Sequence, residues 1–173
     1  MDWIESISYA NQLPACMYQG ALKQKDGGLR GWTTFEEKEW LDQSVFSVKQ
    51  DTRLLGKYAV LKAVEHIKNS GLKHDLKFEK LDYFLPHISS MFFYDKLKNL
   101  LREENVCIPE DNWFTNLSYV GNVGSASIYL MLNELFHSGK LKNNQSIFLF
   151  IPESGRFSYT TALLTVVNAE EKK

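Results

Sequence analysis

Three short segments of the 173-residue sequence carry residues whose chemistry could serve a reaction. His87 follows the apolar run Leu-Asp-Tyr-Phe-Leu-Pro, Asn122 lies in Tyr-Val-Gly-Asn-Val-Gly-Ser-Ala-Ser, and Gly155 lies in the turn Pro-Glu-Ser-Gly-Arg-Phe. A neutral imidazole donates a hydrogen bond, a carboxamide donates without titrating near neutrality, and a glycine leaves its backbone N–H open to close approach. Each segment lies where an apolar element begins or ends, and ligands of α/β proteins bind in the loops beyond strand ends.

Each of these segments also has a purely structural interpretation. A single histidine at a strand end is more often structural than catalytic, and His66, His74 and His137 are expected to be structural, with His66 on the polar side of a helix. The role of Asn122 could be limited to capping the helix that follows it, and residues 152–157 could form an ordinary tight turn. Taken one at a time, the segments favour no function, so their order along the chain has to be considered.

The elements that would position these residues begin at about residue 52, where helical spacing of apolar residues becomes regular. The expected elements are a helix from Thr52 that ends at Gly71, a strand over 81–85 closed by Pro86, a helix from Ser89 or Ser90 to about Glu103, and a weak strand over 113–117. His87 would then stand in the loop between the strand and the second helix.

Three later elements complete the expected fold. A helix over 123–138 is apolar around nearly its whole circumference, which predicts burial on all sides. Residues 146–151 form an unbroken apolar run, typical of a strand in a sheet covered on both faces. The last strand, over 157–167, follows a turn and is expected to run antiparallel to its predecessor. The order of elements predicts an α/β fold, a mixed sheet with helices on both faces.

The first fifty residues have a different character. They hold three of the four tryptophans, Trp3, Trp32 and Trp40, but little periodic apolar sequence. We expect a strand near 3–9, long loops and a short helix near 34–42, with the aromatic side chains packed on something outside this segment. The sequence thus predicts a loop-rich entry segment over 1–50 and a main domain over 51–173, together one compact domain.

Composition excludes several classes of protein. Hydrophobic residues make up 44% of the sequence, which argues against a disordered chain, and 20 Lys+Arg against 21 Asp+Glu leave no basic excess for nucleic acid. No apolar run reaches the ~20 residues that a membrane span needs, and the N-terminus lacks the pattern of a signal peptide. Cys16 and Cys107 lie far apart, without metal-site spacing. We expect a soluble cytoplasmic domain that needs no metal or other cofactor.

Taken together and in order, the segments resemble the C-terminal half of the β-ketoacyl-acyl-carrier-protein synthase III enzymes, which belong to the thiolase superfamily. The resemblance covers about residues 50–167, and its specific part is Tyr-Val-Gly-Asn-Val-Gly-Ser-Ala-Ser with the upstream Phe-Leu-Pro-His. It implies one half of the α-β-α-β-α sandwich of a thiolase-like fold. In that family two similar halves pack about a pseudo-twofold axis.

The resemblance implies a Cys-His-Asn site in which His87 and Asn122 are catalytic. Decarboxylation of a malonyl thioester develops negative charge on the thioester oxygen, and two preorganised donors aimed at that oxygen lower the barrier. Gly155 matches a glycine whose backbone amide helps to form an oxyanion hole. The residues expected to line the substrate tunnel are Ser90, Ser154 and Phe157. Acyl-CoA and acyl-carrier-protein thioesters are the implied substrates, and the acyl carrier protein is an implied partner.

The sequence departs from the family pattern at three places. The family's His-Gln-Ala-Asn is His-Ile-Ser-Ser here, so Ser90 replaces a second asparagine. Phe92 replaces a basic residue used in carrier-protein docking, and the glycine triplet of the last turn has become Ser-Gly-Arg over 154–156. These departures favour a divergent branch of the family with a different primer or acceptor.

We expect the nucleophilic cysteine of the family to lie in an N-terminal half outside this sequence. Cys16 is a candidate nucleophile, but the residues after it are too few and too polar to form the buried helix that would activate a thiolate. Cys107 follows a charged helix end and is a weaker candidate. The chain is therefore expected to be half of an enzyme, unable to form an acyl-enzyme alone. The face that the missing half would cover should be exposed or buried by self-association, as in a homodimer.

Two rival classes of function stay open. A non-catalytic thiolase-fold module would bind an acyl-CoA, a carrier protein or a partner chain, although such a module has no need of both His87 and Asn122. A phosphate binder would use the amides at the start of the 123–138 helix, where neither GxxxxGK nor GxGxxG occurs. The basic side chains that could dock an acidic carrier protein, or simply form a solvated surface, are Lys96, Lys98, Arg102, Lys140 and Lys142.

Overall fold

The computed structural model describes residues 1–168, and their contacts divide the chain into two compact units. The first unit comprises Met1–Ile7, Val60–Pro152 and the chain from Tyr159, and the second comprises Ser8–Ala59 and Glu153–Ser158. The predicted division near residue 50, within one compact domain, stays a prediction. The turn between the last two strands groups with the N-terminal segment in the second unit.

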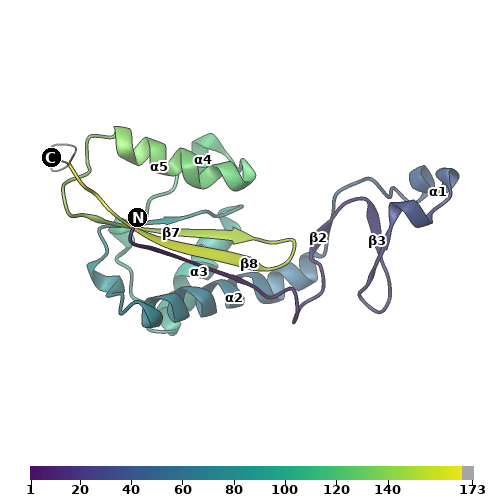
Figure 1. Cartoon of the computed structure of the whole chain (residues 1–173), viewed down its shortest axis with the longest axis horizontal. Coiled ribbons are helices and arrows are strands. Elements are labelled where there is room, and N and C mark those ends of the chain that lie inside the picture. Colours follow the sequence, from purple (N-terminus) through teal and green to yellow (C-terminus); the bar gives the residue numbers. More distant parts are fainter. Residues whose placement is uncertain (169–173) are drawn as a thin grey trace. The chain divides into compact units, whose positions relative to one another are not determined.

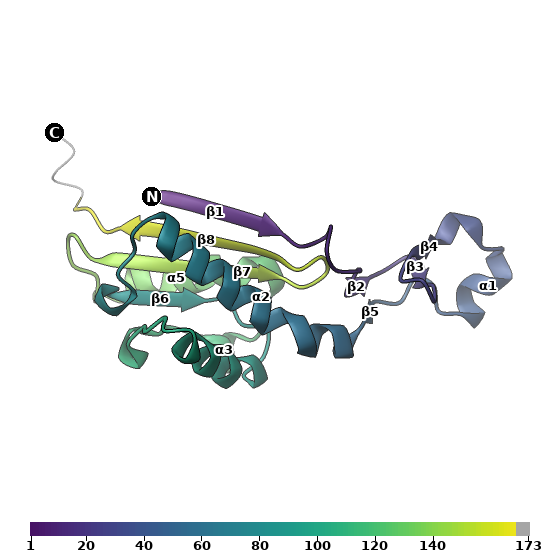
Figure 2. The same cartoon turned by 90° about the horizontal axis from the view of Figure 1, so that it is seen from below.

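The first unit is built on a four-stranded sheet with the strand order β1-β8-β7-β6 (Figure 2). Its strands are β1 (Trp3–Ser8), β6 (Tyr83–Pro86), β7 (Ser146–Glu153) and β8 (Ser158–Thr165). β6 and β7 run parallel, whereas β8 returns antiparallel after a short turn. β1 is antiparallel to β8, since Ser6 lies 2.8 Å from Thr160 and Thr165 donates to Asp2 at 2.8 Å, both distances between side-chain oxygens. The predicted mixed sheet is confirmed.

Helices cover both faces of this sheet, as predicted (Figure 1). The helices are α2 (Thr52–Lys73), η2 (Phe78–Lys80), α3 (Phe92–Glu103), η3 (Glu110–Asn112), α4 (Leu117–Val120), η4 (Gly124–Ala126) and α5 (Ser127–His137). α2 and α3 lie on one face and α5 on the other. Within residues 1–168, no helix has the length and apolar character to cross a membrane.

β7 joins two layers of core because its side chains alternate between the faces of the sheet. On the α5 side, Ile147 and Leu149 belong to a buried cluster. The other members of that cluster are Leu85, Ile128, Met131, Leu135 and Ala162. Phe148 and Phe150 therefore point to the opposite face, where Phe148 stacks on Phe84 with ring centroids 5.5 Å apart. The apolar run is a doubly covered strand, as predicted.

The face of α2 that packs on the sheet carries polar side chains, which corrects the expected place of His66. His66 and Ser70 are buried against Thr161 of β8, with the Thr161 hydroxyl 3.3 Å from His66 Nε2 and donating to Ser70 Oγ at 2.9 Å. These groups satisfy one another, so their burial carries no unpaired polar atom. Burial lowers the pKa of His66 below the usual value of 6.5.

The sequence predicts that α2 ends at Gly71, but the helix continues for two more residues, to Lys73. A Cβ added at Gly71 would lie 2.3 Å from Cζ of Phe78, well inside van der Waals contact. The glycine therefore serves the close approach of η2 to the helix. The ring of Phe78 in turn meets Phe148 of the core at 5.9 Å between centroids.

Two other expectations about the first unit are wrong. Residues 113–117 form no strand, since Trp113 makes only an isolated bridge to Phe84 and α4 follows. The helix expected over 123–138 begins as a regular α-helix only at Ser127, and it is not buried on all sides, because Tyr129 and Phe136 are 72% and 69% exposed. An exposed apolar side is one of the two outcomes that the sequence predicts for the face that a partner half would cover.

The second unit contains two small antiparallel strand pairs, a 3-10 helix and a short α-helix. Its elements are β2 (Met17–Tyr18) paired with β5 (Lys49–Gln50), β3 (Ala21–Lys23) paired with β4 (Leu29–Gly31), η1 (Trp32–Thr34) and α1 (Glu37–Asp42). Trp32, Trp40 and Phe46 pack on one another, with centroids 5.5 to 5.8 Å apart. Trp3, which belongs to the first unit, instead stacks on His74 with ring centroids 4.1 Å apart.

Candidate functional site

The structure brings His87 and the loop of Asn122 to the same edge of the first unit. His87 directly follows β6, and the parallel strands β6 and β7 end at the same edge of the sheet. α5 ends at His137 and leads through residues 138–145 to the start of β7, so its N-terminus points back to the edge where both strands end (Figure 1). Asn122 lies five residues before α5, in the loop at that N-terminus.

His87 is held by its backbone and leaves its ring free. Its N–H donates to the carbonyl of Phe150 at 2.8 Å, which extends the ladder between β6 and β7 by one residue. The side chain is buried, and this burial lowers the pKa of His87 below the usual 6.5, so the ring is neutral near pH 7. Within residues 1–168 neither ring nitrogen has a hydrogen-bond partner, and neither is sealed from solvent. The ring is therefore able to bind a ligand.

Asn122 uses one end of its carboxamide and leaves the other open. Its Oδ1 accepts a hydrogen bond from the N–H of Gly124 at 2.9 Å, which forms a local turn of the loop. The side chain is exposed, and its Nδ2 has no partner among residues 1–168. The amide is thus oriented with its donor end toward solvent. Asn122 does not cap α5, since the N-cap residue is Ala126.

Two glycines allow the loop to take this path. Gly121 ends α4 with φ +84° and ψ 178°, and Gly124 has φ +63°. Backbone in these regions is strained for residues with a Cβ, and the Gly121 conformation is open essentially to glycine alone. The glycines on either side of Asn122 are therefore required by the backbone, whether or not the residue acts on a ligand.

A carboxylate that the sequence does not single out binds the segment just before this loop. Glu134 of α5 accepts hydrogen bonds from Nδ2 of Asn116, at 2.9 Å, and from the hydroxyl of Tyr119. Asn116 is buried and Tyr119 is exposed. The only signal in the sequence is that Glu134 lies seven residues after Ser127, which places both on the same side of the helix.

The residues after His87 form an exposed loop and the start of α3. Ser90, expected in the substrate tunnel, is exposed, and its carbonyl accepts from the N–H of Phe93 at 3.0 Å. α3 begins at Phe92 rather than at Ser89 or Ser90. Phe92 is 63% exposed, and Nζ of Lys96 lies 4.0 Å from its ring centroid. A positive charge therefore stands beside the position where the family carries a basic residue.

The turn with Gly155 belongs to the second unit. The N–H groups of Gly155 and Arg156 both donate to the carboxylate of Glu153, and the carbonyl of Gly155 accepts from the N–H of Cys16 at 2.9 Å. A Cβ at Gly155 would lie 2.6 Å from Oε1 of Glu153 and 3.3 Å from the carbonyl oxygen of Met17. An added Cβ would displace the Glu153 carboxylate and press on the Met17 carbonyl, and the Gly155 amide binds a carboxylate of its own chain.

The two residues of this turn that are predicted to line the substrate tunnel have different environments. Ser154 is half-buried, whereas Phe157 is fully buried and meets the ring of Tyr58 edge-on, with centroids 6.4 Å apart. Phe157 also has φ +52°, which is unusual for a residue with a side chain. The tunnel role of both residues stays a prediction.

Cys16 lies in the second unit in surroundings that keep its thiol protonated. The side chain is fully buried, and Sγ donates to the carbonyl of Asp51 at 3.4 Å. Burial raises the pKa of the Cys16 thiol, and the charge of Asp51 adds to that effect. Lys23 lies 2.8 Å from the Asp51 carboxylate, which takes up its positive charge. Cys107, in contrast, is exposed.

The described part of the chain contains no group of three or more His, Cys, Asp or Glu side chains that could hold a metal ion. The chemistry that this chain's residues can support is hydrogen-bond donation from the neutral His87 ring and from the Asn122 amide. Both groups belong to the first unit, at one edge of its sheet, while Gly155, Ser154 and Phe157 belong to the second.

The sequence of this chain is similar to those of known enzymes. The chain is 29% identical over 107 residues to beta-ketoacyl-[acyl-carrier-protein] synthase III 2 of Bacillus cereus, an alignment that covers 60% of this chain and 30% of the relative. It is 26% identical over 162 residues to the beta-ketoacyl-[acyl-carrier-protein] synthase III of Aliarcobacter butzleri, which covers 94% of this chain and 46% of the relative. The chain thus spans less than half the length of these relatives.

A solved structure supports the same fold. The beta-ketoacyl-[acyl carrier protein] synthase III of Thermus thermophilus superposes with a TM-score of 0.67 at 19% identity, over 96% of this chain and 46% of that one. Residues 72–165, more than half of the chain, match the model of the family described as 3-oxoacyl-[acyl-carrier-protein] synthase III C terminal. That stretch contains His87, Asn122 and Gly155. The chain therefore belongs to the family of C-terminal domains of 3-oxoacyl-[acyl-carrier-protein] synthase III.

Proposed function

We propose that this chain supplies the histidine and asparagine of a condensing enzyme, in which His87 and Asn122 stabilise the enolate formed by decarboxylation of a malonyl thioester. The observation that carries the proposal is the pair of open donors at one edge of the sheet, a buried neutral imidazole without a partner and a carboxamide whose oxygen is already bound. Family membership supports the same assignment.

The reaction needs hydrogen-bond donors at the thioester oxygen while negative charge develops there. The bond between the malonyl carboxylate carbon and the α-carbon breaks, and carbon dioxide leaves. The electron pair of that bond forms an enolate whose charge lies on the thioester oxygen. Two donors fixed in advance stabilise that oxygen without reorganising. The enolate carbon then attacks the carbonyl of an acyl-cysteine, and the thiolate leaves. Under this proposal, no metal or cofactor is required.

A neutral His87 suits this role better than an imidazolium. A protonated ring beside the malonyl carboxylate would stabilise the ground state and oppose the loss of carbon dioxide. Burial of the side chain, which disfavours the charged ring, supports the neutral form near pH 7. Asn122 needs no such tuning, because a carboxamide donates at any pH in this range.

The acyl-cysteine would come from a partner half. Cys16 is buried with a raised pKa, and that environment argues against an acyl-cysteine in this chain. The exposed apolar side of α5, with Tyr129 and Phe136, supports a covering half or self-association. The substrates proposed are acyl-CoA and acyl-carrier-protein thioesters, and the exposed pair Phe92 and Lys96 supports docking of an acidic carrier protein.

Two observations favour the second candidate, a non-catalytic thiolase-fold module that binds an acyl-CoA, a carrier protein or a partner chain. The amide of Gly155, which the resemblance assigns to an oxyanion hole, donates to Glu153 instead. An amide that is already bound offers less to a substrate oxygen. The replacement of the family's second asparagine by Ser90 points the same way, or to a branch with another primer.

The two candidates are separated by His87→Ala and Asn122→Ala in the assembly of this chain with the half that bears the cysteine. We expect each variant to lower the rate of carbon dioxide release from a malonyl thioester by about a hundredfold, because one stabilising donor is lost. Transfer of the acyl group to the cysteine should be much less affected. Unchanged condensation in folded variants would establish the non-catalytic module.

A further inference from the structure

The loop that carries Asn122 is fixed at its C-terminal end by α5. The N–H of Val123 donates to Oγ of Ser127 at 3.2 Å, and Ser127 is the buried first residue of the helix. The N–H of Gly124 is bound by Asn122 itself. This end of the loop is therefore part of the start of α5.

The N-terminal end of the loop follows α4, a single helical turn. α4 is four residues long and has no buried residue, and a single helical turn is not stable by itself. The carboxylate of Glu134 binds this short helix to α5. Asn116, just before α4, donates to one oxygen at 2.9 Å, and Tyr119, within α4, donates to the other.

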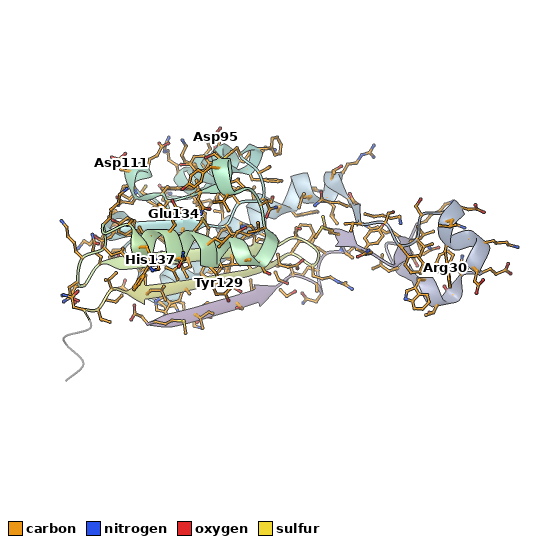
Figure 3. The ribbon with its side chains drawn as sticks, turned by 90° about the horizontal axis from the view of Figure 1, so that it is seen from above. Arg30, Asp95, Asp111, Tyr129, Glu134 and His137 are labelled. Atoms are coloured by element: carbon orange, nitrogen blue, oxygen red, sulfur yellow. The ribbon has the colours of Figure 1, made fainter. Side chains whose placement is uncertain are left out.

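Both ends of the loop are thus bound to one side of one helix. Ser127 and Glu134 are seven residues apart, which is two turns and about 10 Å along α5. Figure 3 shows Glu134 in the C-terminal half of α5, between Tyr129 near its start and His137 at its end. Because a helix is rigid over this length, the distance between the two anchors is set by α5.

The anchor at Glu134 is an ionised carboxylate with two hydrogen-bond donors. Hydrogen bonds from Tyr119 and Asn116 lower the pKa of Glu134, so the carboxylate is ionised near pH 7. The bond to Glu134 raises the pKa of the Tyr119 hydroxyl, which therefore keeps the proton that it donates. Hydrogen bonds to an ionised acceptor are about twice as strong as those between neutral groups.

We propose that Glu134 is a positioning residue for Asn122, because by holding Asn116 and Tyr119 it fixes the N-terminal end of the 121–126 loop and so the place from which the amide donates. The inference rests on the proposed function, since a role for Glu134 in the reaction requires that Asn122 contact the substrate. Glu134 itself acts only through the loop.

Three variants test this role. Glu134→Ala removes both hydrogen bonds. Glu134→Gln keeps an acceptor for Asn116, and its amide can donate to the Tyr119 hydroxyl, which accepts as well as donates. Asn133→Ala is the matched control, because Asn133 is the exposed neighbour on α5 and its side chain has no partner among residues 1–168.

The first measurement is hydrogen exchange of the Gly124 N–H in this chain, which reports on the turn formed by Asn122. We expect Glu134→Ala to accelerate this exchange about tenfold at unchanged global stability, while Glu134→Gln and Asn133→Ala stay near the wild type. Unchanged Gly124 exchange in Glu134→Ala would overturn the proposal. Should Glu134→Ala not fold, Tyr119→Phe replaces it, since it removes one donor from an exposed side chain, with about a threefold acceleration expected.

The second measurement is malonyl-thioester decarboxylation in the assembly with the cysteine-bearing half. We expect Glu134→Ala to lower kcat about tenfold with little change in KM, Glu134→Gln to restore most of the loss, and Glu134→Ala to cost nothing further when Asn122→Ala is already present. Losses that simply multiply would overturn the positioning role. If Asn122→Ala alone costs no activity, the proposed function fails, while the exchange measurement still tests the contact of Glu134 with the loop.

Discussion

The carboxamide oxygen of Asn122 is bound to the backbone N–H of Gly124 at 2.9 Å, so the orientation of the amide is decided before any ligand arrives. Without this bond the oxygen and nitrogen ends of a carboxamide would exchange by rotation of about 180°. With it, only the nitrogen end is presented. A donor oriented in advance is the kind of group that stabilises a developing oxyanion at low cost.

This relationship predicts that Asn122→Asp separates loop structure from function. An aspartate oxygen can accept from Gly124 N–H as the amide oxygen does, so the turn and the stability of the chain should stay within about 0.5 kcal/mol of the wild type. The donor, however, becomes a second negative oxygen. We expect decarboxylation to fall at least as far as in Asn122→Ala, measured as carbon dioxide release in the complete assembly.

The outcome that contradicts this prediction is equally clear. If Asn122→Asp keeps the rate while Asn122→Ala loses it, the residue contributes through the turn and not through its donor. Urea unfolding of both variants provides the control, since Asn122→Ala alone removes the bond to Gly124.

Two buried histidines predict how stability depends on pH. Burial lowers the pKa of His66 and that of His87, so in the folded chain both take up a proton only at pH values below the usual 6.5. The unfolded chain binds those protons as the pH falls through 6.5. Folding stability should therefore be complete above pH 6.5 and decrease below it, by at most about 1.4 kcal/mol per pH unit for each histidine, down to the folded-state pKa values.

Urea unfolding at pH 7.5, 6.5 and 5.5 measures this effect. We expect His66→Gln to reduce the slope of unfolding free energy against pH, because it removes one of the two titrating groups. His137→Gln is the control, since His137 is exposed in the last turn of α5 and binds only the carbonyl of Asn133. An identical slope in the wild type and in His66→Gln would show that His66 titrates normally.

Two glycines of α2 should respond in opposite ways to the same substitution. Gly71→Ala places a methyl group 2.3 Å from the ring of Phe78, which is packed against Phe148 and must move, so we expect a loss of about 1–3 kcal/mol. Gly56 lies in the same helix with no atom within 4 Å of an added Cβ. Gly56→Ala should gain about 1 kcal/mol from helix propensity.

Thermal or urea unfolding of the two variants checks this pair. A gain in both would mean that the approach of Phe78 is looser than the structure indicates. A loss in both would mean that the first turns of α2, where Gly56 lies, need the flexibility of glycine.

How far the sequence determines this fold differs from element to element. β7 could be predicted because an unbroken apolar run carries its own signal of burial on both faces, and the place of His87 follows from the strand that ends just before it. The burial of His66 could not be predicted, since it depends on Thr161, 95 residues away, whose hydroxyl satisfies the ring nitrogen. Polarity along one helix does not reveal a partner on a remote strand.

The candidate site shows the same division. His87 and Asn122 are marked by their neighbours in the sequence, the strand and the glycine pair. Glu134 is one acidic residue among many, and its contact with Asn116 and Tyr119 arises only when α4 packs on α5. The exposed side of α5 follows from composition only in part, because an apolar surface is predicted to need cover, whereas the residues of this chain that would cover it are not specified.

The last prediction concerns the two cysteines, which should differ strongly in reactivity. Cys107 is exposed and open to reagent, whereas Cys16 is fully buried, bound to the Asp51 carbonyl and raised in pKa by its burial. Alkylation with iodoacetamide at pH 8, followed by mass spectrometry, should modify Cys107 at least about a hundredfold faster, with Cys16 modified only when the second unit opens. Cys107→Ser should abolish the fast phase, and mild urea should accelerate the slow one. Acylation of Cys16 by an acyl-CoA in the folded chain, lost in Cys16→Ser, would instead make Cys16 a nucleophile, and the need for a cysteine from a partner half would disappear.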